Sequence, residues 1–374
     1  DHLTLATMDS ICTDGVRFDA AWANPTCTPT RGTILTGEYG FRTGIAGTGE
    51  ASNLTASQRT LPQYLSANII GFQGGSVGKW HLGNDDDLGG LLTPNRFGWD
   101  HYSGALDNID DYTEWPHVTN GHETTSTTYA TTAQIDAAIA WWTAQPDDAP
   151  RLLWFAPNAP HGPFHFPPDG LHTQDTTSKD EAVQYDAMVE ALDVELARLM
   201  SVVDEHTLVI LIGDNGTPPR AVRGPYASNR AKGALYQGGI TVPLCARGPG
   251  VGTGSHSGMV QSVDLFPTIA EYMGAALPED LDGVSLLPLL SDPTLAPVRT
   301  FAYTEQDRSH QEDASPAGGV TVRDDRYKWI RFHDGTERLY NLDKDPLESS
   351  TLHNDDAHEK TRAAMEALYD SIVQ

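Results

Sequence analysis

The stretch Asn24-Pro-Thr-Cys-Thr-Pro-Thr-Arg-Gly-Thr-Ile-Leu-Thr-Gly37 decides how the rest of this chain is interpreted. Pro29 has a φ angle preset for a first helical turn, and a threonine beside Cys27 could cap a helix that continues beyond Arg31. The N-terminus of a helix carries unpaired backbone N–H groups that favour negative charge, so Cys27 would lie where an anion can bind. Free cysteines are commonly buried and inert, however, and the helix alone predicts only a structural cysteine.

The same stretch resembles a family signature. Residues 27–31, Cys-Thr-Pro-Thr-Arg, followed by Leu-Thr-Gly at 35–37, resemble the signature of the type I sulfatases, formylglycine-dependent enzymes of the alkaline phosphatase superfamily. In that family a formylglycine-generating enzyme oxidises the cysteine after translation, and the resulting formylglycine is the nucleophile. The resemblance therefore implies formylglycine at Cys27 and a charge-assisted hydrogen bond from Arg31 to its hydrate.

Composition limits the class of protein and its partners. The 374 residues are 39% hydrophobic and include eight tryptophans, which is ample for a packed interior. The net charge of −27 argues against nucleic-acid binding, which needs a basic surface, and favours a strongly solvated acidic surface. No apolar run approaches the roughly 18 residues that span a bilayer. We expect a periplasmic or secreted protein, although no signal peptide is visible; the oligomeric state is not predicted.

The three cysteines do not form a disulfide framework. If Cys27 is modified, Cys12 and Cys245 remain, and nothing in the sequence indicates that they pair. Both lie in apolar surroundings, so we expect two separate cysteines in the core.

Alternating helix and strand patterns predict an α/β fold. Apolar residues follow the 3.6-residue period between Ala182 and Met200, and the β-branched run Thr207–Ile212 suits a central parallel strand. The resemblance implies an alkaline-phosphatase-like mixed, mostly parallel sheet flanked by helices. We expect this catalytic domain at residues 1–298 and a smaller C-terminal α+β subdomain at 299–374, where strands and a hairpin signal precede a closing helix.

Three polar motifs follow the strand-like pieces that end near residues 77, 155 and 212. In open α/β sheets, ligands bind at the carboxyl ends of the strands, so these motifs predict one shared site. Lys79 and His81 flank Trp80, and on an extended segment both would point to the same face.

The resemblance assigns roles to four basic residues. Lys79 and His81 would surround the modified residue and the sulfate, and His161 would donate a proton to the leaving oxygen. Lys232 precedes a Gly-Gly stretch, as the sulfate-binding lysine of sulfatases does. Without the resemblance, an exposed lysine and a solvated histidine would be the plainer interpretation of each.

Asp214 and Asn215 lie between two glycines after a strand and offer oxygen ligands to a hard divalent cation. A plain turn is the simpler interpretation, but the resemblance favours a metal site to which Cys27 also contributes. The expected cation is Ca²⁺, with Mg²⁺ possible. Sulfatases normally begin with a hydrophobic strand that ends in two further aspartate ligands. No such strand precedes Asp1, so we expect an N-terminal truncation.

The resulting hypothesis is a sulfuric ester hydrolase that cleaves sulfate monoesters of a carbohydrate or an aryl alcohol. Its substrate would be a sulfated small molecule or glycan. One alternative is a phosphonate or phosphate ester hydrolase of the same superfamily. The other is a non-catalytic relative that binds sulfated glycans, an option motivated by the missing aspartate pair.

Overall fold

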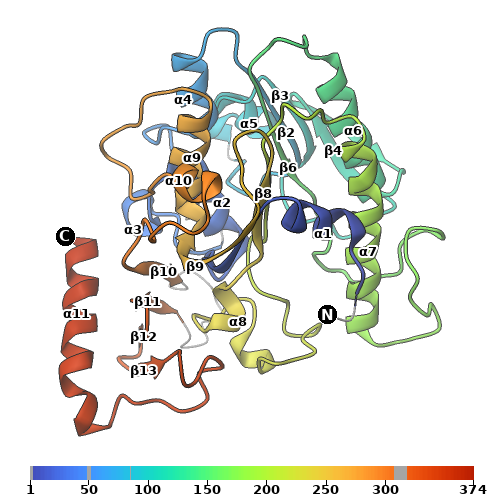
Figure 1. The fold of residues 1–374 in the computed structure, drawn as a ribbon. Helices are drawn as coiled ribbons and strands as arrows, with labels where there is room; N and C mark the ends of the chain where they lie inside the picture. Colours follow the sequence, from blue (N-terminus) through green and yellow to red (C-terminus); the bar gives the residue numbers. More distant parts are fainter. Residues whose placement is uncertain (1–2, 49–51, 85, 307–317) are drawn as a thin grey trace.

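The computed structural model describes residues 3–48, 52–84, 86–306 and 318–374 (Figure 1). The strands are β1 Val16–Trp22, β2 Gln73–Lys79, β3 His101–Ala105, β4 Trp115–Thr119, β5 His122–Ser126, β6 Arg151–Ala156, β7 Val209–Ile212, β8 Leu244–Arg247, β9 Gly254–Gln261, β10 Ala302–Gln306, β11 Gly319–Arg323, β12 Tyr327–Phe332 and β13 Glu337–Asn341. The helices are α1 Ala6–Thr13, α2 Cys27–Thr36, α3 Gly40–Thr43, α4 Leu61–Asn68, α5 Thr93–Arg96, α6 Ala130–Ala144, α7 Glu181–Met200, α8 Gln237–Ile240, α9 Leu265–Tyr272, α10 Leu287–Ser291 and α11 Glu359–Val373, with short 3-10 turns between some of them.

Within these ranges the strands form three sheets, in the orders β5-β4-β3-β2-β6, β7-β8-β1-β9 and β10-β11-β12-β13. β2 runs parallel to both β3 and β6, and β1 runs parallel to β9, whereas β8 is antiparallel to both β1 and β7. Helices pack around the first two sheets. The predicted α/β class, with mixed sheets flanked by helices and a smaller C-terminal sheet, is confirmed. The expected predominance of parallel pairing is not found in the described residues, where β1–β8, β3–β4, β4–β5 and β7–β8 are antiparallel.

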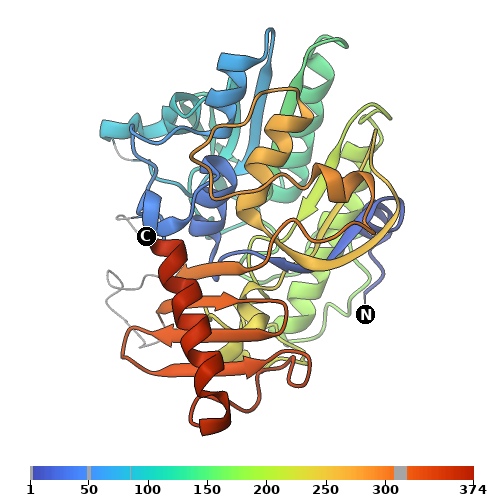
Figure 2. The same ribbon diagram turned by 60° about the vertical axis from the view of Figure 1, so that its left-hand side comes forward.

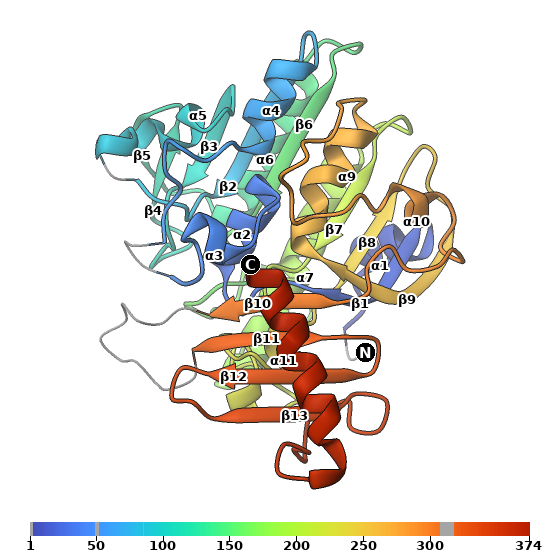
Figure 3. The same ribbon diagram turned by 90° about the vertical axis from the view of Figure 1, so that its left-hand side faces the viewer.

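Helices cover both faces of the strands that lead to the predicted site. On one face, Ile135 of α6 and Leu196 of α7 pack with Val77 of β2. On the other face lie α4 and α9, whose Leu65 and Phe266 share a second apolar cluster (Figure 3). A strand covered on both faces is built from apolar residues throughout, which explains the uninterrupted apolar runs of β6 and β7.

Helix α7 confirms the clearest periodic pattern of the sequence. Asp180 caps it by accepting a hydrogen bond from the backbone N–H of Ala182 at 2.9 Å, and Met188 and Leu192 are buried. Among the residues that the structure describes, no helix is long and apolar enough to cross a membrane.

The expectation of a central parallel strand at residues 207–212 is wrong. β7 pairs only antiparallel with β8 in the described residues and ends its sheet, as β6 ends the neighbouring one. Leu211 faces the cluster under α7, whereas Ile210 faces the opposite cluster, so the strand is covered on both faces as its composition predicted. An apolar run indicates such cover, but it does not identify the strands on either side.

The C-terminal sheet is an antiparallel meander from β10 to β13, and α11 crosses one of its faces (Figure 2). Met365 and Ile372 of α11 pack with Trp329 of β12 and Leu339 of β13. The predicted strands and closing helix are therefore present. The division of the chain at residues 298 and 299 stays a prediction.

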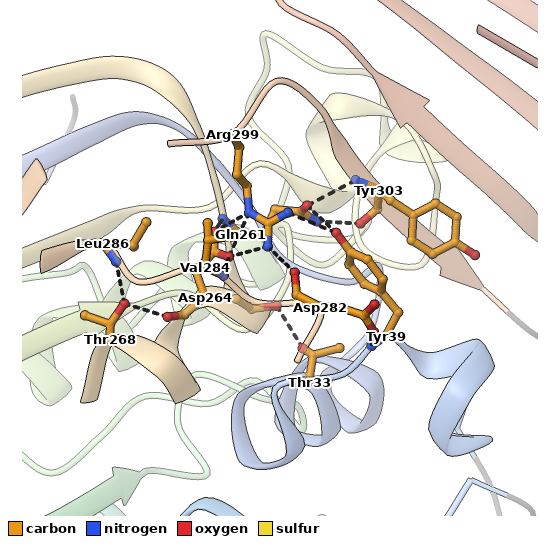
Figure 4. A network of polar contacts seen from close by, with 11 residues as sticks. Thr33, Tyr39, Gln261, Asp264, Thr268, Asp282, Val284, Leu286, Arg299 and Tyr303 are labelled. Carbon is orange, nitrogen blue, oxygen red and sulfur yellow. Dashed lines mark hydrogen bonds and ion pairs between the residues drawn. The ribbon is translucent and has the colours of Figure 1, made fainter. Parts of the chain in front are cut away.

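A buried polar network joins this sheet to the larger part of the chain (Figure 4). Arg299 Nε donates to both carboxylate oxygens of Asp264, at 2.7 and 2.8 Å, and both side chains are almost wholly buried. Arg299 also donates to the hydroxyl of Tyr39 at 3.2 Å and to the carbonyl oxygen of Asp282 at 2.8 Å. The Tyr39 hydroxyl donates in turn to Gln261 at 2.9 Å. The network thus fixes the segment after α2 against the start of α9 and the approach to β10.

The expectation of two separate core cysteines is also wrong. Cys12 of α1 and Cys245 of β8 form a disulfide, with Cα atoms 5.0 Å apart. The two residues are separated by 233 positions, and no local pattern reveals proximity over such a distance. The disulfide ties α1 to the sheet that it covers. Cys27 remains free and buried.

Candidate active site

Helix α2 carries the cysteine at its first position. Thr26 is the N-cap in an extended conformation, but its side chain makes no capping hydrogen bond among the described residues. The helix ends at Gly37, whose φ of 72° is left-handed and whose N–H donates to the carbonyl of Thr33. A Cβ at Gly37 would also lie 2.7 Å from the side chain of Leu281, so this position requires glycine. Every residue of α2 is buried, which holds Cys27 rigidly.

Two polar side chains, His81 and Lys79, contact Cys27, and each has a polar partner of its own. His81 Nδ1 lies 3.2 Å from the Cys27 sulfur and 3.0 Å from the hydroxyl of Thr28. Lys79 Nζ donates to the sulfur at 3.4 Å and to Asn108 Oδ1 at 2.5 Å. The predicted grouping of Lys79 and His81 around Cys27 is therefore present. Asn108 and Thr28 were not predicted, although Asn108 follows β3 at the same sheet edge, and the strand-end rule would have found it.

The prediction that Lys79 and His81 lie on one extended segment is wrong. β2 ends at Lys79, and His81 has a φ of 55°, so the segment is not extended through both residues. The N–H of His81 donates to the carbonyl of Leu106 at 2.7 Å, which holds this left-handed turn in place. Strain of this kind in a non-glycine residue is tolerated where the surroundings impose it, and it is common at functional sites.

The Arg31 side chain contacts the ends of two strands rather than the sulfur of Cys27. Its Nη1 donates to the carbonyl of Lys79, and its Nη2 lies 3.8 Å from Asp214 Oδ2. The guanidinium also lies 5.7 Å from the ring centre of Trp154. Its Nε is buried without a hydrogen-bond partner among the described residues. Arg31 therefore links the ends of β2 and β7, and one of its donors is still unused.

His161 comes from the loop that follows β6, and Lys232 comes from the segment between β7 and α8. His161 Nδ1 donates to the carbonyl of Gly162 at 2.8 Å, which leaves Nε2 as the acceptor of the neutral ring. The Tyr112 hydroxyl donates to the carbonyl of His161 at 2.7 Å. Burial first, then the charges of Lys79 and Lys232, lowers the pKa of His161 to about 4. The same two lysines act on His81, so all four basic side chains belong to one electrostatic cluster.

This cluster is positively charged although the chain is strongly acidic. Burial lowers the pKa of Lys79 to about 8, with Arg31 and Lys232 lowering it further and Cys27 and Asp214 opposing them. Burial, Lys79 and Arg31 lower the pKa of His81 to about 3. A local concentration of cations outweighs the field of distant surface carboxylates, so this cluster suits an anion.

Asp214 and Asn215 lie beside the cluster at the end of β7. Thr30 of α2 donates to the carbonyl of Asp214 at 2.6 Å, which draws the loop toward the cysteine helix. Asn215 Nδ2 donates to the carbonyl of Gly216, whereas its Oδ1 is buried without a partner in the described part of the chain. The unpartnered Asn215 oxygen and the Asp214 carboxylate are the type of ligand that a hard cation prefers. These two side chains alone provide too few ligands, because Ca²⁺ takes six to eight oxygens. Within the described ranges, no group of three or more histidine, cysteine, aspartate or glutamate side chains could hold a metal.

We expect the folded chain to lose stability as the pH falls below about 6.5. Burial lowers the pKa values of a group of histidines: His101, His117, His161 and His165. Each binds its proton more weakly in the folded chain, so the unfolded chain gains protons first and becomes relatively more stable. Thermal unfolding at pH 7.5, 6 and 5 should show a falling midpoint. Added salt should leave much of the fall in place, since desolvation is not screened. A constant or rising midpoint would contradict these shifts.

Comparison with known proteins places these features in a family. Residues 2–275 match the model of a family described as sulfatase, and residues 230–373 match one described as the C-terminal part of N-sulphoglucosamine sulphohydrolase. Human arylsulfatase A is 25% identical over 93% of this chain and 78% of its own length. The N-acetylgalactosamine-6-sulfatase of Sus scrofa is 27% identical over 79% of this chain, which spans 63% of that protein.

Solved structures share the fold. BT4656, solved with its substrate D-glucosamine-2-N,6-O-disulfate, aligns with a TM-score of 0.81 at 20% identity, covering 99% of this chain and 92% of its own. Ps i-CgsB, solved with k-i-k-neocarrahexaose, also has a TM-score of 0.81, at 23% identity, covering 98% of this chain and 86% of its own.

Proposed function

Because this chain belongs to the sulfatase family and is therefore a sulfuric ester hydrolase, we propose that Cys27 is the residue through which it cleaves sulfate monoesters. The observation that carries the proposal is the position of Cys27. It begins a buried helix and lies within contact of Lys79 and His81, inside a cationic cluster. The Cys27 sulfur marks the place of the formylglycine oxygens after oxidation by a formylglycine-generating enzyme.

The modified residue, as an aldehyde hydrate, would supply one hydroxyl that attacks sulfur while the bond from sulfur to the alcohol oxygen breaks. Deprotonation of its second hydroxyl would then re-form the aldehyde and break the C–O bond to sulfate, which leaves. Lys79 and His81 hold the side chain at position 27 in one orientation, since both contact its terminal atom. Arg31 supports Lys79 through its backbone carbonyl and brings a further positive charge to the pocket. An unmodified thiol would leave a sulfur-linked sulfate without an easy exit, which is why the proposal includes the modification.

His161 is the proposed proton donor to the leaving alcohol oxygen. In the free chain it is neutral, with Nε2 as acceptor, because the pKa is about 4. Binding of an anionic ester beside it offsets the charges of Lys79 and Lys232, which raises that pKa toward the range in which the ring can hold and pass a proton. Lys232 supplies the remaining positive charge for the sulfate oxygens.

We also propose that Asp214 and Asn215 contribute to a divalent cation site, for Ca²⁺ by preference and Mg²⁺ otherwise, with modified Cys27 as a further ligand. The unpartnered Asn215 Oδ1 supports this assignment. A cation bound there would polarise the sulfate and neutralise charge. Among the described residues, no group of three or more histidine, cysteine, aspartate or glutamate side chains completes such a site.

We expect Ca²⁺ to stabilise the chain through these two residues. A free Ca²⁺ concentration of about 100 times its dissociation constant should raise the free energy of unfolding by about 2.7 kcal/mol. Thermal unfolding of an EDTA-treated sample with and without CaCl₂ measures the effect without any assay of activity. The double variant D214A/N215A should lose the shift, whereas D19A, which removes an exposed carboxylate of β1, should keep it. The same shift in D214A/N215A would place the cation elsewhere.

The proposed substrate is a sulfated carbohydrate, with small aryl sulfates as the alternative. Support comes from the structural relatives solved with a sulfated glucosamine and with a neocarrahexaose, and from the cationic cluster around Cys27. We propose a periplasmic or secreted location, which the Cys12–Cys245 disulfide supports because such bonds persist in oxidising compartments.

The test of the proposed function has two readouts. Co-expression with a formylglycine-generating enzyme should lower the intact mass by about 18 Da, the difference between a thiol and an aldehyde side chain. The converted protein should hydrolyse 4-nitrophenyl sulfate and sulfated oligosaccharides faster than matched phosphate and phosphonate esters. Faster phosphonate turnover would favour the related phosphoryl hydrolases. An unconverted thiol and sulfated-glycan binding without turnover would favour the non-catalytic alternative.

A further inference from the structure

A turn of the C-terminal subdomain reaches the active-site segment. It follows β13, and the carboxylate of Asp345 holds it by accepting hydrogen bonds from the backbone N–H groups of Ser349 and Ser350, at 2.8 and 2.9 Å. Its central residue, Glu348, is wholly buried and has a left-handed φ of 56°. A buried, charged and strained residue at one point requires a specific cause.

Glu348 contacts two different parts of the chain. Its Oε1 lies 2.6 Å from Lys328 Nζ, and both side chains are fully buried. Its Oε2 accepts a hydrogen bond from the backbone N–H of Gln237 at 2.6 Å. Arg230 Nη1 donates to the carbonyl oxygen of Leu347, at 3.1 Å, and to that of Glu348. The turn is therefore hydrogen-bonded to residues 230 and 237, which lie on either side of Lys232 in the sequence.

Backbone hydrogen bonds also fix residues 232 and 233, between the two contacts of the turn. The N–H of Lys232 donates to the carbonyl of Thr217 at 3.0 Å, and that of Gly233 donates to the carbonyl of Pro25 at 2.7 Å, two residues before Cys27. A Cβ at Gly239 of α8 would lie 2.1 Å from the carbonyl oxygen of Ala234. A displacement at Gln237 is thus passed to Lys232 and to the cysteine loop, because the packing between them cannot absorb it.

Stability alone does not account for this arrangement. A buried ion pair often contributes no more than well-packed apolar residues of the same size, because desolvation offsets the attraction. Lys328 needs only one carboxylate oxygen, yet the second oxygen of Glu348 is aimed at Gln237, the first residue of α8. We therefore attribute the strained conformation of the turn to the hydrogen bond between Glu348 and the Gln237 N–H.

We propose that Glu348 is a positioning residue for the sulfate site: through the Gln237 N–H and Arg230, it holds the segment that carries Lys232 against the loop before Cys27. This inference rests on the proposed role of Lys232 in binding sulfate. Glu348 itself does not touch the substrate. It is a contribution of the C-terminal subdomain to a site whose other side chains come from the larger part of the chain.

The test breaks the contact between Glu348 and Gln237 from the Gln237 side. Q237P deletes the N–H at the first position of α8, where proline is tolerated and where the preceding Tyr236 is already extended (ψ 161°). Q237A removes the side chain and keeps the N–H, so it is the matched control. We expect Q237P to raise both the KM for 4-nitrophenyl sulfate and the Ki of inorganic sulfate by at least about fivefold, with a smaller change in kcat. Q237A should behave as the native chain.

Two further variants decide between outcomes. In a K232A background, Q237P should add little to either constant, because the contact acts through Lys232. K328M/E348M replaces the ion pair by apolar residues, so it should keep its unfolding temperature near the native value and still raise both constants. If Q237P and K328M/E348M both match the native chain while K232A does not, the positioning role is overturned. If K232A itself leaves KM and Ki unchanged, the proposed role of Lys232 is the part that fails.

Discussion

Replacing Cys27 with alanine is expected to lower kcat/KM for sulfate ester hydrolysis by at least about 10⁴-fold, the usual cost of deleting a covalent nucleophile. Alanine cannot be converted to formylglycine, and among the described residues no other nucleophilic side chain contacts both Lys79 and His81. The side chain is buried and small, so the helix should form as before. Steady-state kinetics on 4-nitrophenyl sulfate measures the effect on protein produced with the formylglycine-generating enzyme.

A second variant on the same helix separates chemistry from folding. Thr36 is also buried in α2 and donates only to the carbonyl of Gly32 and weakly to that of Glu38, so T36A perturbs the helix but not the pocket. We expect T36A to keep its activity within a few-fold, and C27A to keep the unfolding temperature of the native chain. C27A with more than a tenth of the native activity would show that the reaction does not proceed through residue 27.

Much of this site was predictable, because its residues follow two simple rules. Lys79 and Asp214 come at or just after the carboxyl ends of strands, and such ends gather at one sheet edge. Cys27 begins a helix that points its N-terminus at that edge, and the motif around it is specific. Local patterns suffice for such residues, since each one's position depends on the element that it terminates.

Other features depend on contacts that no local pattern contains. The Cys12–Cys245 disulfide spans 233 positions, and the Glu348 contact with Gln237 spans 111. The neighbours of β7 depend on which strands reach it, and its apolar composition is the same in either case. His81 reaches Cys27 through a left-handed turn that the surrounding backbone imposes, not through the alternation of an extended strand. Tertiary packing decides each of these outcomes, and it cannot be derived from a run of residues.

The second large effect is expected at the network that joins the C-terminal sheet to the catalytic part. Replacing Arg299 with methionine should lower the free energy of unfolding by about 3–5 kcal/mol, because it leaves the carboxylate of Asp264 buried without its cation. Backbone N–H groups of Gln261 and Val284 still donate to that carboxylate, at 2.8 and 2.9 Å, but they carry no full charge.

Urea denaturation of R299M and of the native chain measures this difference, and R17M, which breaks the exposed pair between Arg17 and Asp19, is the control. Exposed pairs are worth about 0–1 kcal/mol, so R17M should remain close to the native chain. The double variant R299M/D264L should recover part of the loss, since it removes the stranded charge together with its partner. A loss below about 1 kcal/mol in R299M would mean that backbone donors alone satisfy Asp264. Recovery in the double variant would show that the loss in R299M comes mainly from the unpaired buried carboxylate of Asp264, because desolvation of the two charges offsets most of their attraction.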